Sequence, residues 1–363
     1  MTLQDIANLR LLNQQIAIGK FNTPLEVVKH MGAMQAQDYY GSLWAIGLRC
    51  NHTEKEVIKA IEDLKIVRTW PQRGTLHFVP AEDAKWLVSL SADRLLKGAQ
   101  RRRQNLGLDD TVLLKSTKVV TMALQHGMLT RQKVMDALEA TGISTQSGRG
   151  YHILWYLSQS GVTFIGPMQG KQQTIGLLDK EIACQNYFDP QDGKIELAKR
   201  FFISHGPATV QDFVRWSGLT TVDVKVCIEA NKPLLVSQKV DDQEYWMPKE
   251  LPDQTLPITD SYLLSGFDEY MLGYKDRTAS LHINHAQKIV PGGNGMFLPT
   301  IVVNGQVVGT WKRAIKKNHV LISLSPFEAL TNSELESLKK PANQYGQFLS
   351  LPTKLKLDSK IIL

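Results

Sequence analysis

The residues best suited to chemistry in this chain are two glutamines, Gln35 and Gln37, in the run 34–38. They stand two positions apart, so they project from one side of an extended or turn segment but lie roughly 200° apart on a helix, at about 100° per residue. If both serve one site, we expect a non-helical joint between two amphipathic segments, 24–34 and 40–50. Alone, a Gln-x-Gln triplet indicates no more than a polar loop, so its meaning depends on the rest of the chain.

Length and composition predict an ordinary soluble protein. The chain has 363 residues, 43% of them hydrophobic and 21% charged, which allows several modules with cores of their own. We see no apolar run near the roughly 18 residues that cross a bilayer and no secretion signal, so we expect a cytoplasmic protein without membrane contact that associates with the nucleoid when it acts on DNA. The three widely spaced cysteines, Cys50, Cys184 and Cys227, indicate reduced thiols.

We expect no metal and no other cofactor. His282 and His285 have an i, i+3 spacing, but no nearby residue completes a metal site. The glycine-rich stretch 291–295 lacks the setting of a phosphate loop and is predicted to be a turn.

The net charge of +7, from 42 basic and 35 acidic residues, allows an acidic polymer as a partner. Five cations gather in one predicted helix, which either contacts phosphates or is a solvated helix face. They are Arg94, Lys97, Arg101, Arg102 and Arg103.

A degenerate repeat organises the middle of the chain. His126-Gly-Met-Leu-Thr130 recurs as His205-Gly-Pro-Ala-Thr209, each after an apolar-periodic segment. Each threonine is placed to cap a following helix, 131–140 or 210–217, which predicts two helix-turn-helix units. Further predicted helices, 150–159 and 221–230, precede predicted hairpins. The strands of these hairpins are 162–165 with 173–175, separated by a loop, and 234–240 with 244–247, joined at Asp241-Asp242.

The N-terminal section fits the same winged-helix plan. Its predicted helices are 9–18, 24–34 and 54–64, and its hairpin joins 65–70 to 74–79. The segment 35–50 is then an insertion, which is where a site is usually grafted onto a repeated unit.

The C-terminal section has a different texture. Strands 297–303 and 306–312 flank Asn304-Gly305, a pair typical of a type I′ turn. With a strand at 318–324, they predict a small antiparallel sheet or barrel with a helical tail from near Asn332. The linker before it is expected at 248–257.

With these segments in place, the chain resembles the AlkZ/YcaQ-like winged-helix DNA glycosylases. The similar stretches follow one another along nearly the whole chain: MQAQD at 34–38, WAIGLR at 44–49, RTWPQRGTLH at 68–77, HGPAT at 205–209, WSGL at 216–219, FDEYMLGY at 267–274 and TWKR at 310–313. The resemblance implies an α+β protein with three tandem winged-helix domains around a concave DNA channel and a β-rich, barrel-like C-terminal domain. We assign 1–114, 115–190 and 191–257 to the winged helices and 258–363 to the last domain.

The resemblance also implies an activity, that of a monofunctional DNA glycosylase. Gln35 and Gln37 correspond to the polar pair of the family's Gln-x-Gln branch, with Ala36 in place of a larger aliphatic residue. The implied partner is double-stranded DNA with alkylated purines, which the protein is expected to bind as a monomer. An interstrand crosslink and a simple N7-alkylpurine remain alternative lesions, as do self-resistance and general repair.

Amides suit such a substrate because an N7-alkylated purine already carries positive charge and departs without an acid. The remaining task is to hold water against an oxocarbenium-like sugar, which neutral amides can do although they are not general bases. Glycosidases generally use two carboxylates instead. The rival interpretations are a winged-helix regulator that reads sequence in the major groove, and a lesion binder without chemistry.

Other candidate residues have both a functional and a structural interpretation. Asp38 either supports catalysis or caps the helix 39–49, and His77 either touches the lesion or is a satisfied structural histidine. Arg73 either contacts phosphate or is a solvent-facing turn charge. Trp44 and Trp70 are expected in the core. The remaining candidates either contact the DNA backbone or form a solvated strand edge: Lys312, Arg313, Lys316 and Lys317.

Overall fold

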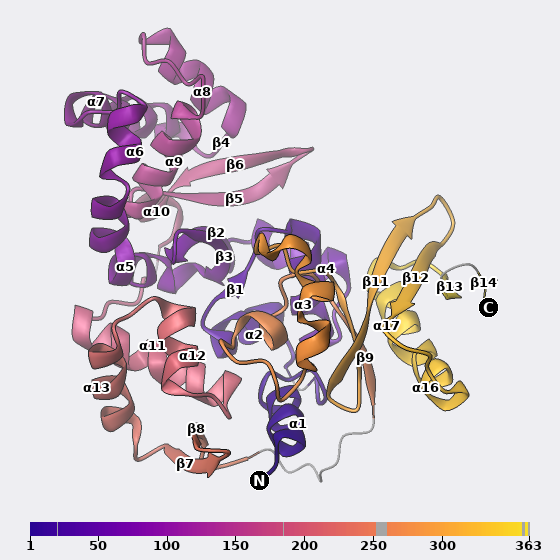
Figure 1. Ribbon diagram of the computed structural model, residues 1–363. Coiled ribbons are helices and arrows are strands. Elements are labelled where there is room, and N and C mark those ends of the chain that lie inside the picture. The colour runs from indigo at the N-terminus through magenta and orange to yellow at the C-terminus, as the bar shows by residue number, and fades with distance from the viewer. Residues whose placement is uncertain (20, 184, 252–259, 358–359, 362–363) are drawn as a thin grey trace. The chain divides into compact units, whose positions relative to one another are not determined.

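A computed structural model describes the chain except residues 20, 184, 252–259, 358–359 and 362–363 (Figure 1). It divides into a first unit, residues 1–57 with 197–363, and a second unit, residues 58–196. In the part that is described, no helix has both the length and the apolar character to span a membrane. Most of the predicted linker, and Cys184, lie outside the described residues.

Three helices begin the first unit: α1 (Leu3–Asn13), α2 (Pro24–Met31) and α3 (Tyr39–Cys50). Helix α1 begins earlier than predicted because Thr2 caps it in a capping box with Asp5. Helix α2 ends at Gly32, whose φ of 76° only glycine adopts readily. The short strand β1 (Met34–Gln35) follows, and α4 (Glu54–Glu62) comes after α3.

The second half of the repeat folds as predicted. Helices α11 (Pro190–His205), α12 (Val210–Ser217) and α13 (Thr221–Asn231) precede the hairpin of β7 (Leu235–Val240) and β8 (Gln243–Pro248). Thr209 caps α12 by accepting a hydrogen bond from the backbone N–H of Asp212. Asp241 and Asp242 have φ of 45° and 64°, as a tight hairpin turn requires.

The C-terminal section is an open six-stranded sheet, so the sheet that was predicted as one alternative is present and the barrel is wrong. Its order is β14-β13-β12-β11-β10-β9, and the pair β12–β13 is parallel whereas an all-antiparallel sheet was expected. The turn at Asn304-Gly305 is confirmed by φ of 50° and 78°. The strands are β9 (Ser261–Leu264), β10 (Thr300–Val303), β11 (Gln306–Ile315), β12 (Val320–Pro326), β13 (Thr353–Leu357) and β14 (Lys360–Ile361).

Short helices complete the first unit. They are α14 (Glu269–Leu272), η3 (Ile283–His285), α15 (Ala286–Ile289), η4 (Pro291–Gly293), α16 (Asn332–Ser337) and α17 (Lys339–Leu349). The helical tail thus begins at the predicted place. Helix α17 contacts α3, β9 and β13, and the buried Trp44 of α3 packs edge-on against Tyr345 of α17 at 5.0 Å between ring centroids.

In the second unit, strands are hydrogen-bonded in the order β3-β2-β5-β6-β4. The strands are β2 (Ile66–Gln72), β3 (Thr75–Pro80), β4 (Leu129–Thr130), β5 (Thr163–Gln169) and β6 (Gln172–Leu177). The helices are η1 (Ala81–Asp83), α5 (Ala84–Gly98), α6 (Gln100–Asn105), α7 (Asp110–Ala123), η2 (Leu124–His126), α8 (Arg131–Ala140), α9 (Arg149–Gln159) and α10 (Leu178–Glu181). The predicted cap at Thr130 is confirmed by its bond from the backbone N–H of Lys133.

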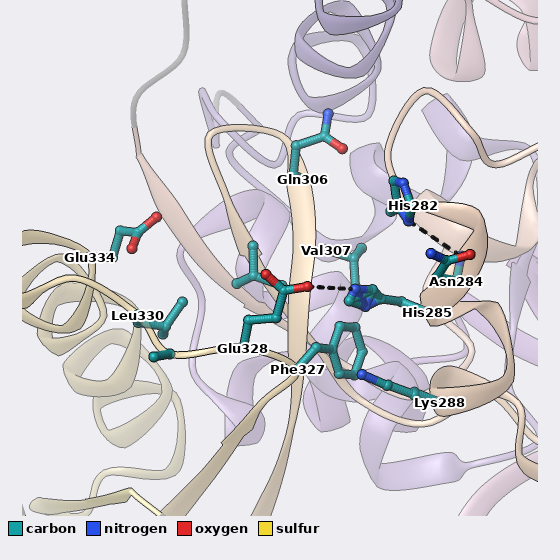
Figure 2. Close-up of a pocket in the computed structure, with 12 residues that line it drawn as sticks. His282, Asn284, His285, Lys288, Gln306, Val307, Phe327, Glu328, Leu330 and Glu334 are labelled. Carbon is teal, nitrogen blue, oxygen red and sulfur yellow. Dashed lines mark hydrogen bonds and ion pairs between the residues drawn. The ribbon is translucent and has the colours of Figure 1, made fainter.

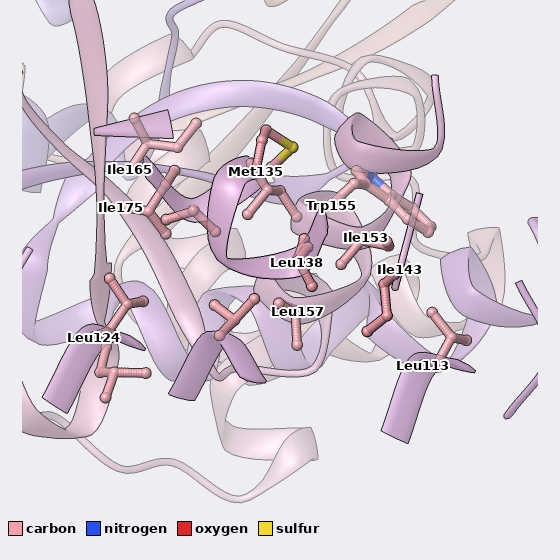
Figure 3. Packing of buried hydrophobic residues seen from close by; sticks show 14 of the residues in the cluster. Leu113, Leu124, Met135, Leu138, Ile143, Ile153, Trp155, Leu157, Ile165 and Ile175 are labelled. Carbon is pink, nitrogen blue, oxygen red and sulfur yellow. The ribbon is translucent and has the colours of Figure 1, made fainter. Parts of the chain in front are cut away.

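One core unites these helices with the hairpin. Figure 3 shows Leu138 of α8, Ile153 and Leu157 of α9, and Ile165 and Ile175 of β5 and β6 packed together. The predicted loop after Ile165 is wrong, because β5 continues to Gln169 across a register shift between Ile165 and Met168. Bulges of this kind accommodate residues such as the Gly-Pro pair that follows Ile165.

Candidate active site

The segment that carries the two glutamines is a non-helical joint between α2 and α3, as predicted. Gln35 ends β1, Gln37 lies in a bend, and α3 begins at Tyr39. Ala36 is fully buried, whereas Gln35 is half-buried and Gln37 is exposed. In the described residues, neither glutamine side chain has a hydrogen-bond partner in the protein. Neither amide is therefore occupied by a hydrogen bond within the described protein.

A buried carboxylate fixes the backbone of this joint. The N–H of Gln35 donates to Oε1 of Glu269 at 3.1 Å, and the indole Nε1–H of Trp216 donates to Oε2 at 2.9 Å. The Glu269 side chain is 1% exposed, and Nε2 of His205 lies 3.5 Å from Oε2. Because a buried carboxylate is costly unless its oxygens receive donors, the N–H groups of Gln35 and Trp216 stabilise one orientation of Glu269.

His205 is held in turn by its own surroundings. Its ring stacks on Phe201 with centroids 4.6 Å apart and planes 12° apart, and Nδ1 lies 2.7 Å from Oγ of Ser204. Burial lowers the pKa of His205, which favours the neutral imidazole at neutral pH.

The residue before Glu269 anchors the far end of helix α3. Asp268 accepts two hydrogen bonds from Arg49, at 2.8 Å and 3.0 Å. Arg49 also donates to the backbone oxygen and the side-chain oxygen of Gln14, at 2.9 Å and 3.0 Å. Both charged side chains are almost fully buried. Adjacent carboxylates therefore hold the inserted segment near both ends, at Gln35 and at Arg49.

Comparison with known proteins places the chain in a family. The family model described as "DNA glycosylase AlkZ-like" matches residues 28–348. This chain belongs to that family. The membership confirms the resemblance seen in the sequence.

The chain is similar to a relative and to a solved structure, both from Streptomyces sahachiroi. The relative, named Interstrand DNA cross-link repair glycosylase, is 24% identical over 343 residues, which cover 87% of this chain and 88% of the relative. The solved structure is that of DNA glycosylase AlkZ. It has a TM-score of 0.81 and 22% identity, covering 98% of this chain and 99% of that chain. The structural match supports the fold.

The motif FDEYMLGY of this AlkZ-like chain is therefore a buried support for the joint. Asp268 also caps α14 by accepting from the backbone N–H of Tyr270, and the hydroxyl of Tyr274 donates to the backbone oxygen of His205 at 2.7 Å. The sequence indicated that this motif belongs to the family pattern but did not indicate a role for Glu269, Trp216 or His205. The signal that could have found them is an acidic pair among large apolar residues, which is costly to bury without partners.

Asp38 and His77 each occupy a structural position. Asp38 caps α3 by accepting from the backbone N–H of Gly41 at 3.1 Å, which confirms the capping interpretation. His77 is fully buried on β3 within the second unit, where Nδ1 lies 2.9 Å from the backbone oxygen of Thr75. Trp44 and Trp70 are buried in cores, as predicted.

The basic helix of the prediction is two helices. Arg94 and Lys97 lie on α5, whereas Arg101 and Arg102 lie on α6, and Ala99 separates the two. All four side chains are exposed. Arg73, in the turn between β2 and β3, has a φ of 52°.

The cations of β11 differ in their surroundings. Lys312 is exposed, but Arg313 donates to the hydroxyl of Tyr345 at 2.9 Å. Burial raises the pKa of Tyr345 to about 12, so its hydroxyl stays protonated at neutral pH. Lys316 and Lys317, beyond the end of β11, are exposed.

A cavity of about 540 Å³ lies elsewhere in the first unit, and neither glutamine lines it. Figure 2 shows His285 in this cavity facing Glu328, with Nε2 and Oε1 3.4 Å apart. Across the described ranges, no group of three histidine, cysteine, aspartate or glutamate residues is arranged to hold a metal ion.

Proposed function

We propose that this AlkZ-like chain is a monofunctional DNA glycosylase that hydrolyses the N-glycosidic bond of cationic alkylated purines, with Gln35 and Gln37 as its catalytic residues. The observation that carries the proposal is the joint: two amides without protein partners flank a fully buried Ala36, in a chain that matches the family over residues 28–348. The relative named for interstrand cross-link repair supports a crosslinked purine as one such substrate.

The chemistry follows from the charge of the lesion. A purine alkylated at N7 is a good leaving group without protonation, so the protein needs no general acid for the base. Each amide offers an oxygen that accepts a hydrogen bond from water and an NH₂ group that donates to a neighbouring oxygen. Gln35 and Gln37 would thus orient water toward the sugar carbon as the C–N bond breaks. One well-placed polar contact of this kind contributes about 3 kcal/mol, roughly a hundredfold in rate.

The nearby carboxylates are engaged elsewhere, which fits a site limited to destabilised bonds. Asp38 caps α3, and both oxygens of Glu269 accept hydrogen bonds from Gln35 and Trp216. We expect these amides to leave an uncharged, undamaged purine intact.

DNA would be held by five cations and by three winged-helix domains, with boundaries at 114, 190 and 257. The cations are Arg73, Arg101, Arg102, Lys312 and Arg313, and each phosphate contact adds sequence-independent affinity. We treat the active species as a cytoplasmic monomer on double-stranded DNA.

The test is the release of N7-methylguanine from duplex DNA, scored as abasic sites. Wild-type protein should turn over, and Gln35→Ala or Gln37→Ala should slow the reaction about a hundredfold while DNA binding is retained. Gln287→Ala, which alters an exposed glutamine on α15, serves as the matched control and should match wild type. A sequence-reading regulator or a passive lesion binder would bind DNA without turnover, and no turnover on any cationic lesion would reject the proposal.

A further inference from the structure

We infer that Glu269 is a positioning residue for catalysis: its carboxylate sets the place of Gln35, while Trp216 sets the place of the carboxylate. This inference rests on the proposed role of Gln35. Nothing requires Glu269 to touch DNA, because its side chain is 1% exposed and directed at groups of the protein.

The place of the Gln35 side chain depends on the place of its backbone nitrogen. The backbone nitrogen of Gln35 is one bond, about 1.46 Å, from the Cα that bears the side chain. Strand β1 has only two residues, so few ladder hydrogen bonds can fix this backbone. The bond from the Gln35 N–H to Oε1 of Glu269, at 3.1 Å, therefore decides where the glutamine side chain starts.

A carboxylate suits this position because two donors face it. Gln35 and Trp216 donate to different oxygens of the same group. A carboxylate accepts at both oxygens, whereas a carboxamide has one oxygen and one NH₂ group. Replacement of Glu269 by glutamine would therefore leave one of the two donors facing another donor.

The elements that carry the Glu269 carboxylate are themselves fixed. Glu269 begins α14, whose cap Asp268 is fixed by Arg49. A Cβ added at Gly273 would lie 2.7 Å from Cδ2 of His205, so glycine allows the imidazole to pack closely against this short helix. The Glu269 carboxylate therefore has little room to move if the backbone at Gln35 shifts.

The central experiment compares single-turnover release of N7-methylguanine by wild type and Glu269→Gln. A shift of about 1 Å in a reacting group costs up to roughly a hundredfold in rate, so we expect the variant to be tenfold to a hundredfold slower with DNA affinity within about twofold of wild type. Glu229→Gln removes an exposed carboxylate on α13 and should change neither quantity.

Two combined variants separate positioning from a general loss of structure. Trp216→Phe removes the second donor, so in the double variant with Glu269→Gln the amide oxygen can turn to Gln35 without conflict. The double variant should recover at least part of the rate that Glu269→Gln loses. In a Gln35→Ala background, Glu269→Gln should cost no further rate, because the side chain that it positions is absent.

A readout independent of activity is hydrogen exchange of the Gln35 amide, measured on peptides that span the joint. Exchange should accelerate in Glu269→Gln, return toward wild type in the double variant with Trp216→Phe, and stay unchanged in Glu229→Gln. An unchanged exchange rate in Glu269→Gln, or rate losses that multiply with Gln35→Ala, would overturn the inference. If wild type shows no turnover at all, the proposed function fails while the exchange measurement still decides the positioning.

Discussion

The buried ion pair between Arg49 and Asp268 gives a sharp stability prediction. Both side chains are at most 1% exposed and share two hydrogen bonds of 2.8 Å and 3.0 Å. Replacing Asp268 with alanine leaves the guanidinium buried with only the oxygens of Gln14 and Ala45. Breaking a buried pair costs about 3–5 kcal/mol, and the lost cap on α14 accounts for about 1 kcal/mol of that range.

The measurement is the free energy of unfolding of the first unit in urea, with thermal unfolding alongside. For a unit of this size about 1 kcal/mol shifts Tm by roughly 2–4 °C, so Asp268→Ala should lower Tm by roughly 6–20 °C. The control is Asp260→Ala in the same unit, whose carboxylate pairs with Lys340 at 3.3 Å but is 49% exposed. It should cost less than about 1 kcal/mol.

A double variant tests whether the lost stability comes from the unpaired guanidinium of Arg49. Arg49→Met with Asp268→Leu removes both charges and should recover most of the lost stability, since well-packed apolar residues commonly replace a buried pair without loss. If Asp268→Ala destabilised the protein no more than Asp260→Ala, the claim that this pair anchors helix α3 would be wrong.

Two further predictions concern charge. Replacing both Arg101 and Arg102 with alanine should weaken DNA binding equally across sequences. It should also reduce the slope of log K against log salt concentration by about two, one for each phosphate contact. Titrations at several salt concentrations measure this slope, and an unchanged slope would exclude both residues from the DNA interface. Burial lowers the pKa of His30 from 6.5 to about 4, so its contribution to stability is complete above pH 6.5 and is lost as the pH falls toward 4. The loss is about 3 kcal/mol. Urea midpoints between pH 4 and 7 should therefore depend less on pH in His30→Gln than in wild type, and equal slopes would show that His30 does not control this window.

Local chemistry made much of the architecture predictable. The caps at Thr130, Thr209 and Asp38 form as expected because a capping oxygen needs only a backbone N–H three residues away. The turn at Asn304-Gly305 was likewise predictable, because the two residues themselves tolerate positive φ.

The wrong structural predictions concern elements whose pairing or continuity the local sequence does not fix. The C-terminal strands alternate as a barrel strand would, but closure depends on which edges meet, and β13 instead joins β12 in parallel in an open sheet. The break at Ala99 that divides the basic helix was likewise not predicted from helical periodicity.

The sequence alone predicted a non-helical joint at Gln35 and Gln37 if both serve one site, because two amides two positions apart can share one side only of an extended segment. Tertiary structure alone decided what fixes that joint: Glu269, 234 residues away in the chain from Gln35, accepts its backbone hydrogen. No local periodicity encodes such a pairing, since a buried carboxylate is stabilised by whichever donors the completed fold brings to it.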